Sequence, residues 1–299
     1  MRRGSMARSL LGLGLLVVLG CAPRERVVGF DSSGAAVDAG ATFSAPVLVT
    51  GLLDPTDEIQ DASLSPDELE IYFASLKNGT YDIWTSNRSA IGAPWNPGVL
   101  VEELSTTTSS DFEPDLSYDG LTMYFSSDRP PAAPTLRIWV SRRSQRSDPW
   151  GAPEIVDLGA TSADRAPAVD VRGLLMAIAS DRGTGDLDIY FSTRQTPTAA
   201  WGLPVDVSEV NSPVFDWDPA LYDSGLGLVF GSRRSGDQTT SDLFETTRAT
   251  YTTPFDAPRS LVELNSPMSE GDPWLSNDGR HVVFSSDRSG ISQLYEAWR

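Results

Sequence analysis

Paired carboxylates are the groups in this 299-residue chain whose spacing most suggests chemistry. The two acids of a pair stand two positions apart, and the pattern returns every 52 to 54 residues. Side chains two residues apart in an extended segment lie on the same side, so we expect both acids of a pair to face one way. Carboxylates arranged like this can pair with arginine, hold a divalent cation or bind a polar ligand. The acids of this pattern are Asp61, Asp111, Glu113, Asp164, Asp216, Asp218, Glu270 and Asp272, and in two of the five repeats one acid of the pair is replaced, by Ile59 or Ala166.

A row of arginines accompanies the acids, each 18 residues after the first acid of its pair. We predict that these acids and arginines gather at one mouth of a repeated structure and form a binding site there. The same recurrence would also arise if the acids bonded arginines and backbone N–H groups of adjacent repeats. A third interpretation is a divalent cation such as calcium, although the sequence assigns no definite metal site and no cofactor. The arginines are Arg129, Arg182, Arg234 and Arg288.

The acids belong to a repeat that contains four short strands. Apolar segments such as LTMYFSS (121–127) and HVVFSS (281–286) each follow a turn sequence, SYDG or SNDG, in which glycine accepts a positive φ without steric cost. A third strand ends in arginine, and a fourth begins at an aromatic residue seven positions later. About 50 residues with four strands is the signature of a β-propeller blade. The repeat units span about 57–104, 109–158, 160–210, 211–264 and 265–299.

The last repeat stops at Arg299 after three strands, whereas an unassigned stretch, FSAPVLVTGL (43–52), precedes the first repeat. Phe43 and Pro46 match the aromatic residue and the proline that open the fourth strand of other repeats. We therefore predict an all-β fold over residues 43–299: a five-bladed β-propeller of four-stranded antiparallel blades, closed by the N-terminal strand completing the last blade. This pairing also covers a sheet edge that would otherwise be open.

Two segments, EPDLSYDGLTMYFSSDR (113–129) and DPWLSNDGRHVVFSSDR (272–288), carry a resemblance to a known family. The pattern resembles the TolB-type, WD-like propeller repeat, and it extends over about residues 57–299. The resemblance implies the propeller fold. Proteins with this repeat include partners of envelope complexes and propellers attached to peptidases. We find neither the α/β domain that precedes the propeller in TolB nor a hydrolase domain, so the resemblance implies fold rather than activity.

The regular repeat and the lack of catalytic sets favour a non-catalytic module that binds a protein or glycan of the cell envelope. The alternative is a glycan-cleaving enzyme that uses carboxylates at the mouth, since such enzymes use carboxylate pairs about 5–10 Å apart. No acid stands out from the repeat pattern as a catalytic residue would. The single histidine, His281, aligns with Thr122 and is interpreted as a surface strand residue, so histidine-based catalysis and metal sites lack their parts.

The N-terminal residues predict export. Arg2 and Arg3 precede an apolar run from Leu10 to Gly20, which is short for a membrane span. The tetrad that ends at Cys21, Val-Leu-Gly-Cys, resembles the bacterial lipobox and implies cleavage after residue 20 and lipidation of Cys21. Residues 21–42 are then a flexible tether from the lipidated cysteine. We expect a membrane-anchored lipoprotein outside the cytoplasm, at the outer membrane or in the periplasm if the bacterium has two membranes.

The net charge of the chain argues against one class of binding partner. A net charge of −18 repels phosphate backbones, so nucleic acid is not expected to bind. We expect a monomer that meets the membrane only through its lipid anchor.

Overall fold

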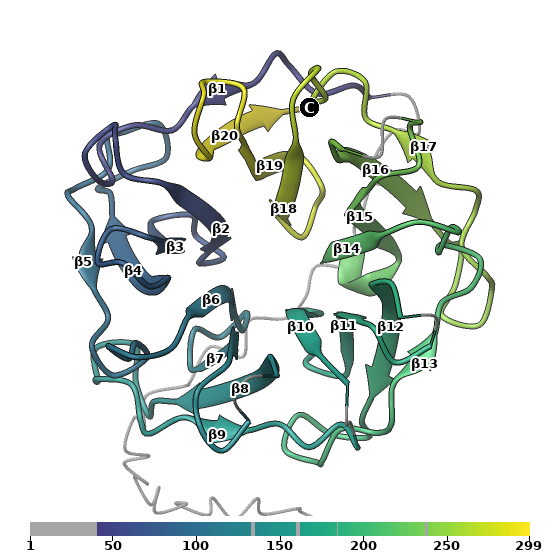
Figure 1. Ribbon diagram of the computed structural model, residues 1–299, viewed down its shortest axis with the longest axis horizontal. Coiled ribbons are helices and arrows are strands. Elements are labelled where there is room, and N and C mark those ends of the chain that lie inside the picture. Colours follow the sequence, from purple (N-terminus) through teal and green to yellow (C-terminus); the bar gives the residue numbers. More distant parts are fainter. Residues whose placement is uncertain (1–40, 133–134, 160–161, 184, 237–238) are drawn as a thin grey trace, which may run out of the picture. The chain divides into compact units, whose positions relative to one another are not determined.

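The structure, a computed structural model, describes residues 41–132, 135–159, 162–183, 185–236 and 239–299. These residues form five antiparallel sheets of four strands each, arranged around a common axis (Figure 1). The predicted five-bladed β-propeller is confirmed. The predicted signal sequence and tether, including Cys21, lie outside the described residues. Nowhere in the described ranges does a helix have the length and hydrophobicity needed to span a bilayer.

Each sheet is one blade, and the blades are numbered one to five in chain order. Blade one contains β2 (Ile59–Leu64), β3 (Glu70–Ser75), β4 (Asp82–Asn87) and β5 (Val99–Leu100). Blade two contains β6 (Asp111–Leu116), β7 (Thr122–Ser127), β8 (Arg137–Arg142) and β9 (Glu154–Ile155). Blade three contains β10 (Asp164–Val169), β11 (Leu175–Ser180), β12 (Asp188–Thr193) and β13 (Val205–Asp206).

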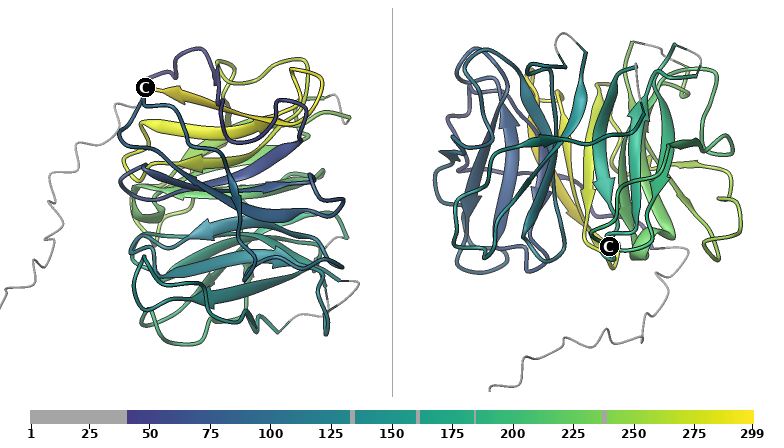
Figure 2. Two further views of the ribbon diagram at one scale, coloured as in Figure 1. Left: turned by 90° about the vertical axis from the view of Figure 1, so that its left-hand side faces the viewer. Right: turned by 90° about the horizontal axis from the view of Figure 1, so that it is seen from below.

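Blade four contains β14 (Asp216–Tyr222), β15 (Gly227–Ser232), β16 (Asp242–Thr247) and β17 (Arg259–Ser260), with a short 3-10 turn, η1 (Asp223–Gly225), between the first two. Blade five contains β18 (Glu270–Leu275), β19 (His281–Ser286), β20 (Gln293–Trp298) and β1 (Val47–Leu48). The first strand of every blade lies nearest the axis, and the blade strands run alongside one another in side view (Figures 1 and 2).

The blades are held together by apolar side chains buried between neighbouring sheets. Tyr72 and Ile83 of blade one share a buried cluster with Met123 and Phe125 of blade two. A single sheet cannot cover both of its own faces, so each blade depends on the next one for burial. This requirement continues around the axis until the last blade meets the first.

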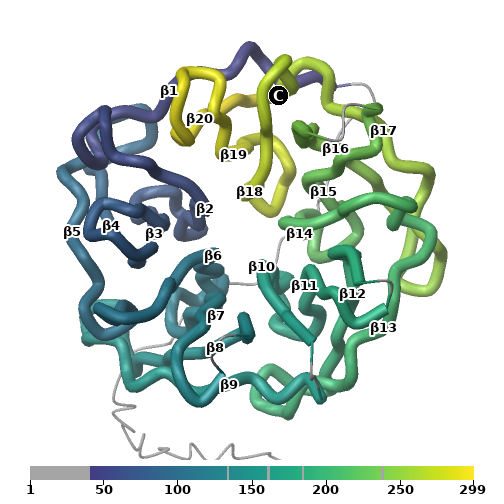
Figure 3. Tube along the Cα trace, in the orientation of Figure 1, coloured from purple at the N-terminus to yellow at the C-terminus, as the bar shows by residue number. Residues whose placement is uncertain are grey.

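The ring closes through the N-terminal strand, as predicted. Val47 and Leu48 of β1 pair with Glu296 and Tyr295 of β20, and the N–H of Val49 donates to the carbonyl of Leu294 at 2.9 Å. In Figure 3 the purple segment that holds β1 runs beside the yellow β20. The two ends of the described chain therefore share one sheet.

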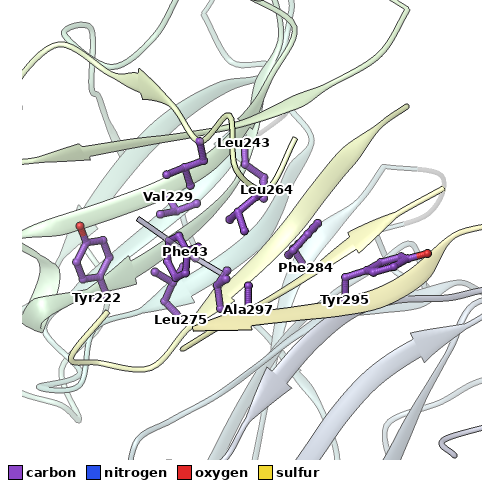
Figure 4. Packing of buried hydrophobic residues seen from close by; sticks show 12 residues of the cluster. Phe43, Tyr222, Val229, Leu243, Leu264, Leu275, Phe284, Tyr295 and Ala297 are labelled. Atoms are coloured by element: carbon purple, nitrogen blue, oxygen red, sulfur yellow. The ribbon is translucent and has the colours of Figure 1, made fainter. Parts of the chain in front are cut away.

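Phe43 shows why this segment belongs to blade five. The Arg299 guanidinium lies 4.4 Å from the centre of the Phe43 ring, and the other four blades repeat this contact within themselves. Phe43 is also buried among apolar side chains of blades four and five, including Leu264 and Leu275 (Figure 4). The repeated contacts join Arg88 to Trp95, Arg143 to Trp150, Arg194 to Trp201, and Arg248 to Phe255.

His281 does not lie on the surface, so its interpretation as a surface strand residue is wrong. Its side chain is buried between two carboxylates, with Nδ1 2.9 Å from Glu68 Oε2 and Nε2 3.3 Å from Glu296 Oε2. The imidazole also stacks on Trp298 at 4.6 Å. Burial lowers the pKa of His281, but the hydrogen bonds and charges of the two glutamates outweigh it and leave the pKa raised. The protonated histidine thus links blade five to the turn after β2 in blade one.

We expect the stability contribution of His281 to be lost at high pH. A raised folded-state pKa means that the contribution is complete below about 6.5, the unfolded value, and disappears as pH rises through the folded value. In urea unfolding, His281→Asn should therefore be less stable than the parent at pH 6, and the gap should narrow by at most about 1.4 kcal/mol per pH unit above 6.5. Asp256→Asn, at an exposed position, is the control and should run parallel to the parent. A constant gap for His281→Asn between pH 6 and 9 would contradict this role.

Candidate functional site

An irregularity in the innermost strands sets the direction of every acid in the repeat. The pairing register of each first strand shifts after its second residue, and the third residue adopts a positive φ between 49° and 58°. Such a left-handed backbone is strained for a residue with a Cβ. The residues in this conformation are Asp61, Glu113, Ala166, Asp218 and Asp272.

This bulge overturns the expectation that both acids of a pair face the same way. Asp111 points into its own blade and bonds Ser127 and Arg129, whereas Glu113 bonds the Arg165 side chain and the Ala166 N–H of the next blade. The alternation rule fails because the inserted residue breaks the two-residue period between them. The predicted single group of acids is therefore two separate rows.

The outer row, made of Asp111, Asp164, Asp216 and Glu270, fastens blades two to five internally. Asp111 is fully buried, and its Oδ1 accepts bonds from Ser127 Oγ and Arg129 Nη2, both at 2.5 Å. Burial raises the pKa of Asp111, although Ser127 and Arg129 pull it down. Arg129 also donates to the carbonyl of Leu104 at 2.5 Å. The equivalent pairs are Arg182 with Asp164, Arg234 with Asp216, and Arg288 with Glu270.

These arginines also stack on aromatic rings of their own blades. The Arg129 guanidinium lies 5.0 Å from the Phe125 ring centre, and Arg234 lies 5.0 Å from that of Phe230. A buried acid, a serine, an arginine and a ring thus form one unit in blades two to five. Blade one has Ile59 in place of the acid, and its Lys77 pairs with Asp57 instead.

The inner row, made of Asp61, Glu113, Asp218 and Asp272, lies around the axis and joins blade one to two, two to three, and four to five. Glu113 Oε2 accepts a bond from the Ala166 N–H at 2.8 Å, and Asp61 Oδ2 accepts one from the Glu113 N–H at 3.3 Å. Asp218 Oδ2 accepts from the Asp272 N–H at 3.4 Å. Glu113 thereby presents its carboxylate to one neighbouring blade and its N–H to the other. Backbone bonds to adjacent blades, one of the interpretations of the sequence, are found here.

The inner acids surround a small axial cavity of about 40 Å³, and none of the residues that line this cavity is basic. Burial, with repulsion from Asp272 and Glu113, raises the pKa of both Asp61 and Asp218 well above the usual range. Arg165 opposes these shifts from beside Glu113. Within the described residues no group of three or more acids, histidines or cysteines is placed to hold a metal ion, so calcium binding stays a prediction.

A cleft of about 440 Å³ lies against this row, at the end of the axis where the innermost strands begin. Asp218 and Asp272 line both the cleft and the axial cavity, and Trp217 lines the cleft beside them. Gly271 lies close to Asp218, because a Cβ there would come within 3.3 Å of Asp218 Oδ2. Asp218 Oδ1 is buried and has no hydrogen-bond partner among the described residues.

Trp217 and Gly271 were missed in the sequence because they lie between the two acids of a pair. The residue at this position differs in every blade, whereas its neighbours recur. Aligning the repeats on the acids and comparing the residue between them would have revealed a position that differs in all five blades. The residues at this position are Gln60, Phe112, Arg165, Trp217 and Gly271.

No protein-family model matches this chain, and no curated protein matches it in sequence. Solved structures that match it include TolB from Acinetobacter baumannii, at 17% identity and TM-score 0.51, covering 81% of this chain and 54% of that one. The endo-arabinase from Bacteroides thetaiotaomicron matches at 14% identity and TM-score 0.57, covering 87% and 98%. A family 117 glycoside hydrolase from Zobellia galactanivorans matches at 12% identity and TM-score 0.58, covering 86% and 90%.

These matches show a shared fold, and this chain spans about half the length of that TolB. They also correct one expectation. The prediction that the chain is not an enzyme is contradicted, because several structures that share its fold over most of its length are glycoside hydrolases.

The acid–arginine units should be essential to blade stability. Arg129→Met leaves the buried Asp111 without its cation, and removing one partner of a buried pair costs about 3–5 kcal/mol. Urea unfolding at pH 7 measures this loss. Arg142→Met is the matched control, because its partner Glu154 is 3.6 Å away and both side chains are exposed, so the cost should stay under about 1 kcal/mol. Equal losses for the two variants would refute the fastening role.

Proposed function

We propose that this protein is a cell-envelope propeller that binds glycans in the cleft between blades four and five. The observation that carries the proposal is the position of Trp217 beside Asp218 and Asp272 in a 440 Å³ cleft. An apolar ring next to a few convergent polar groups is typical of small-molecule sites. The Arg233 guanidinium lies 5.2 Å from the centre of the Trp217 ring, so sugar C–H groups would pack on the part of the indole that Arg233 leaves free, and the acids would accept hydrogen bonds from hydroxyl groups.

The charge of the residues that line the cleft favours neutral glycans over acidic ones. Its lining includes Glu58, Asp272 and several serines, and no basic residue is among them. Such a surface repels uronic acids and sulfated sugars, whereas serine hydroxyls and carboxylates match neutral hydroxyl groups. We therefore infer a neutral glycan as the ligand.

Hydrolysis of the bound glycan is the second candidate, and the raised pKa of Asp218 favours it. Burial and the neighbouring Asp272 raise the pKa of Asp218 well above its usual range, so this carboxyl holds its proton to higher pH than an ordinary aspartic acid and would serve as a general acid. Glycoside hydrolases need a second carboxylate at a distance of about 5–10 Å. Glu58 and Asp287 line the same cleft and are the acids available for that part. The solved structures that share the fold include an arabinofuranosidase and an endo-arabinase, which supports this option.

The N-terminal sequence supplies the location. Cleavage after residue 20 and lipidation of Cys21 would hold the propeller at a membrane surface, with residues 21–42 as the tether. This anchor would present the cleft to glycans of the cell envelope.

Removing the ring of Trp217 should weaken glycan binding at least tenfold. Calorimetric titration of the mature protein against neutral oligosaccharides, before and after Trp217→Ala, measures the change, and urea unfolding checks that the variant folds. Tyr251→Ala is the control, because Tyr251 is an exposed aromatic residue outside the cleft. Unchanged affinity in a folded Trp217→Ala protein would place the glycan elsewhere.

If the protein cleaves glycans, Asp218→Asn should abolish the activity while sparing binding. An amide keeps the shape of the carboxyl but cannot supply the proton, and general-acid catalysis is worth about 10²–10⁴-fold in rate. Release of reducing ends from a panel of neutral polysaccharides is the readout, with Asp256→Asn as the surface control. Equal rates for Asp218→Asn and the parent would remove Asp218 from the reaction, and no product from any substrate would leave binding as the function.

Cys21→Ser should release the protein from the membrane. Serine cannot form the thioether, so the variant should lose incorporated lipid label and appear in the soluble fraction, whereas the parent stays with the membrane. A membrane-bound Cys21→Ser protein would disprove the anchor.

A further inference from the structure

The axis has a second opening, at the end opposite the cleft. A funnel of about 350 Å³ is lined by the last residues of the innermost strands and by the turns that follow them. In blade five, for example, Ser269–Asp272 line the cleft, whereas Pro273–Asp278 line the funnel. The inner acid row lies between the two spaces, so the funnel is separate from the proposed glycan site.

One layer of this funnel departs from the symmetry of the ring. The register places one residue of each innermost strand at the same height, two positions after the left-handed residue. The residue just before this position is proline in four blades and alanine in one. The asymmetric layer contains Ser63, Asp115, Ala168, Ala220 and Trp274.

Small and large side chains are segregated within this layer. Ala168 and Ala220 of blades three and four leave space, whereas Asp115 and Trp274 project a carboxyl and an indole from blades two and five. Ser63 at the same height makes the equivalent bond to the next blade, since its Oγ accepts from the Leu116 N–H at 2.9 Å. That bond is therefore a structural contact that serine can supply, and the negative charge of Asp115 is the feature of this layer that the contact does not require.

Asp115 is an acid without a counter-ion. Its Oδ2 accepts one bond, from the Val169 N–H at 3.0 Å, and no side chain among the described residues donates to it. Asp115 is partly buried, and desolvation raises its pKa to about 7, with no neighbouring cation to lower it. Keeping a carboxylate in such a place is costly unless a positive partner arrives.

The other acids of the funnel are already engaged. Glu68 pairs with His281 and lies 3.8 Å from Arg88, and Asp278 accepts bonds from Ser276 Oγ and the Arg280 N–H. No lysine, arginine or histidine lines the funnel. An anion would thus meet only negative groups, and a metal ion would find a single unengaged carboxylate, which is too few ligands. A cation that needs one carboxylate and an aromatic wall fits this funnel.

We propose that the funnel binds an organic ammonium group, with Asp115 as its counter-ion and Trp274 as the aromatic wall. An ammonium donates hydrogen bonds to the carboxylate and is attracted to the face of an indole. A free amine and a lysine side chain share this chemistry, and either can enter a space of about 350 Å³.

Titration followed by NMR tests the proposal at the funnel itself. The backbone amide of Val169, which bonds Asp115, is the reporter, and the probes are cyclohexylamine, N-acetyl-lysine amide and the neutral isostere cyclohexanol. Each probe is added to about 10 mM, at which a ligand with a Kd of about 1 mM is nearly saturating. Asp115→Asn removes the charge and keeps an acceptor for Val169, and Asp256→Asn is the matched surface control.

We expect a saturable shift of the Val169 signal with cyclohexylamine, and affinity at least tenfold weaker for cyclohexanol and for Asp115→Asn. Asp256→Asn should bind like the parent. Binding of N-acetyl-lysine amide as well would identify a lysine side chain as a possible source, and its failure beside a binding amine would favour a free amine. The proposal is overturned if amine and alcohol bind equally, if folded Asp115→Asn keeps full affinity, or if neither ammonium probe shifts Val169. The alcohol comparison uses the parent protein, so the test does not depend on the variant folding.

Discussion

A blade with two apolar faces cannot exist alone, and this constraint determines the rest of the structure. Every blade must be covered on both sides, so the row of five is stable only as a closed ring. The closure depends on Phe43–Val49, which supplies the outer strand of blade five and fills the cluster between blades four and five. The axis, the cleft and the funnel exist only because the ring is closed.

The left-handed residue of each innermost strand is the second organising feature. In the four blades where this residue is an acid, it turns the carboxylate toward the axis and so separates the outer row, which bonds within blades two to five, from the inner row, which bonds between blades. Several acids must then crowd around a cavity of about 40 Å³ with Arg165 as the nearby cation. The strain and repulsion are tolerated because packing between the blades fixes the backbone.

Sequence reasoning could predict the fold because the period, the turn residues and the terminal strand are all visible in the order of residue types. It could not predict the direction of the acids, because a bulge leaves no signature when the two acids keep the spacing of a regular strand. The same reasoning misplaced His281, since its partners Glu68 and Glu296 come together only through the closed ring. Trp217 and Asp115 were overlooked because the repeats were compared only at positions where residue types recur. Both residues lie at positions that vary between repeats, and so do the proposed ligand sites.

Closure of the ring by the N-terminal segment is the central claim, and the free energy of unfolding tests it most directly. Phe43→Ala and Val47→Ala alter the same short segment, but Phe43 is 5% exposed and Val47 is 56% exposed. If the segment completes blade five, urea unfolding should show a loss of about 3–5 kcal/mol for Phe43→Ala and about 0.5 kcal/mol or less for Val47→Ala. Losses that are equally small for both variants would show that the N-terminal segment does not close the ring.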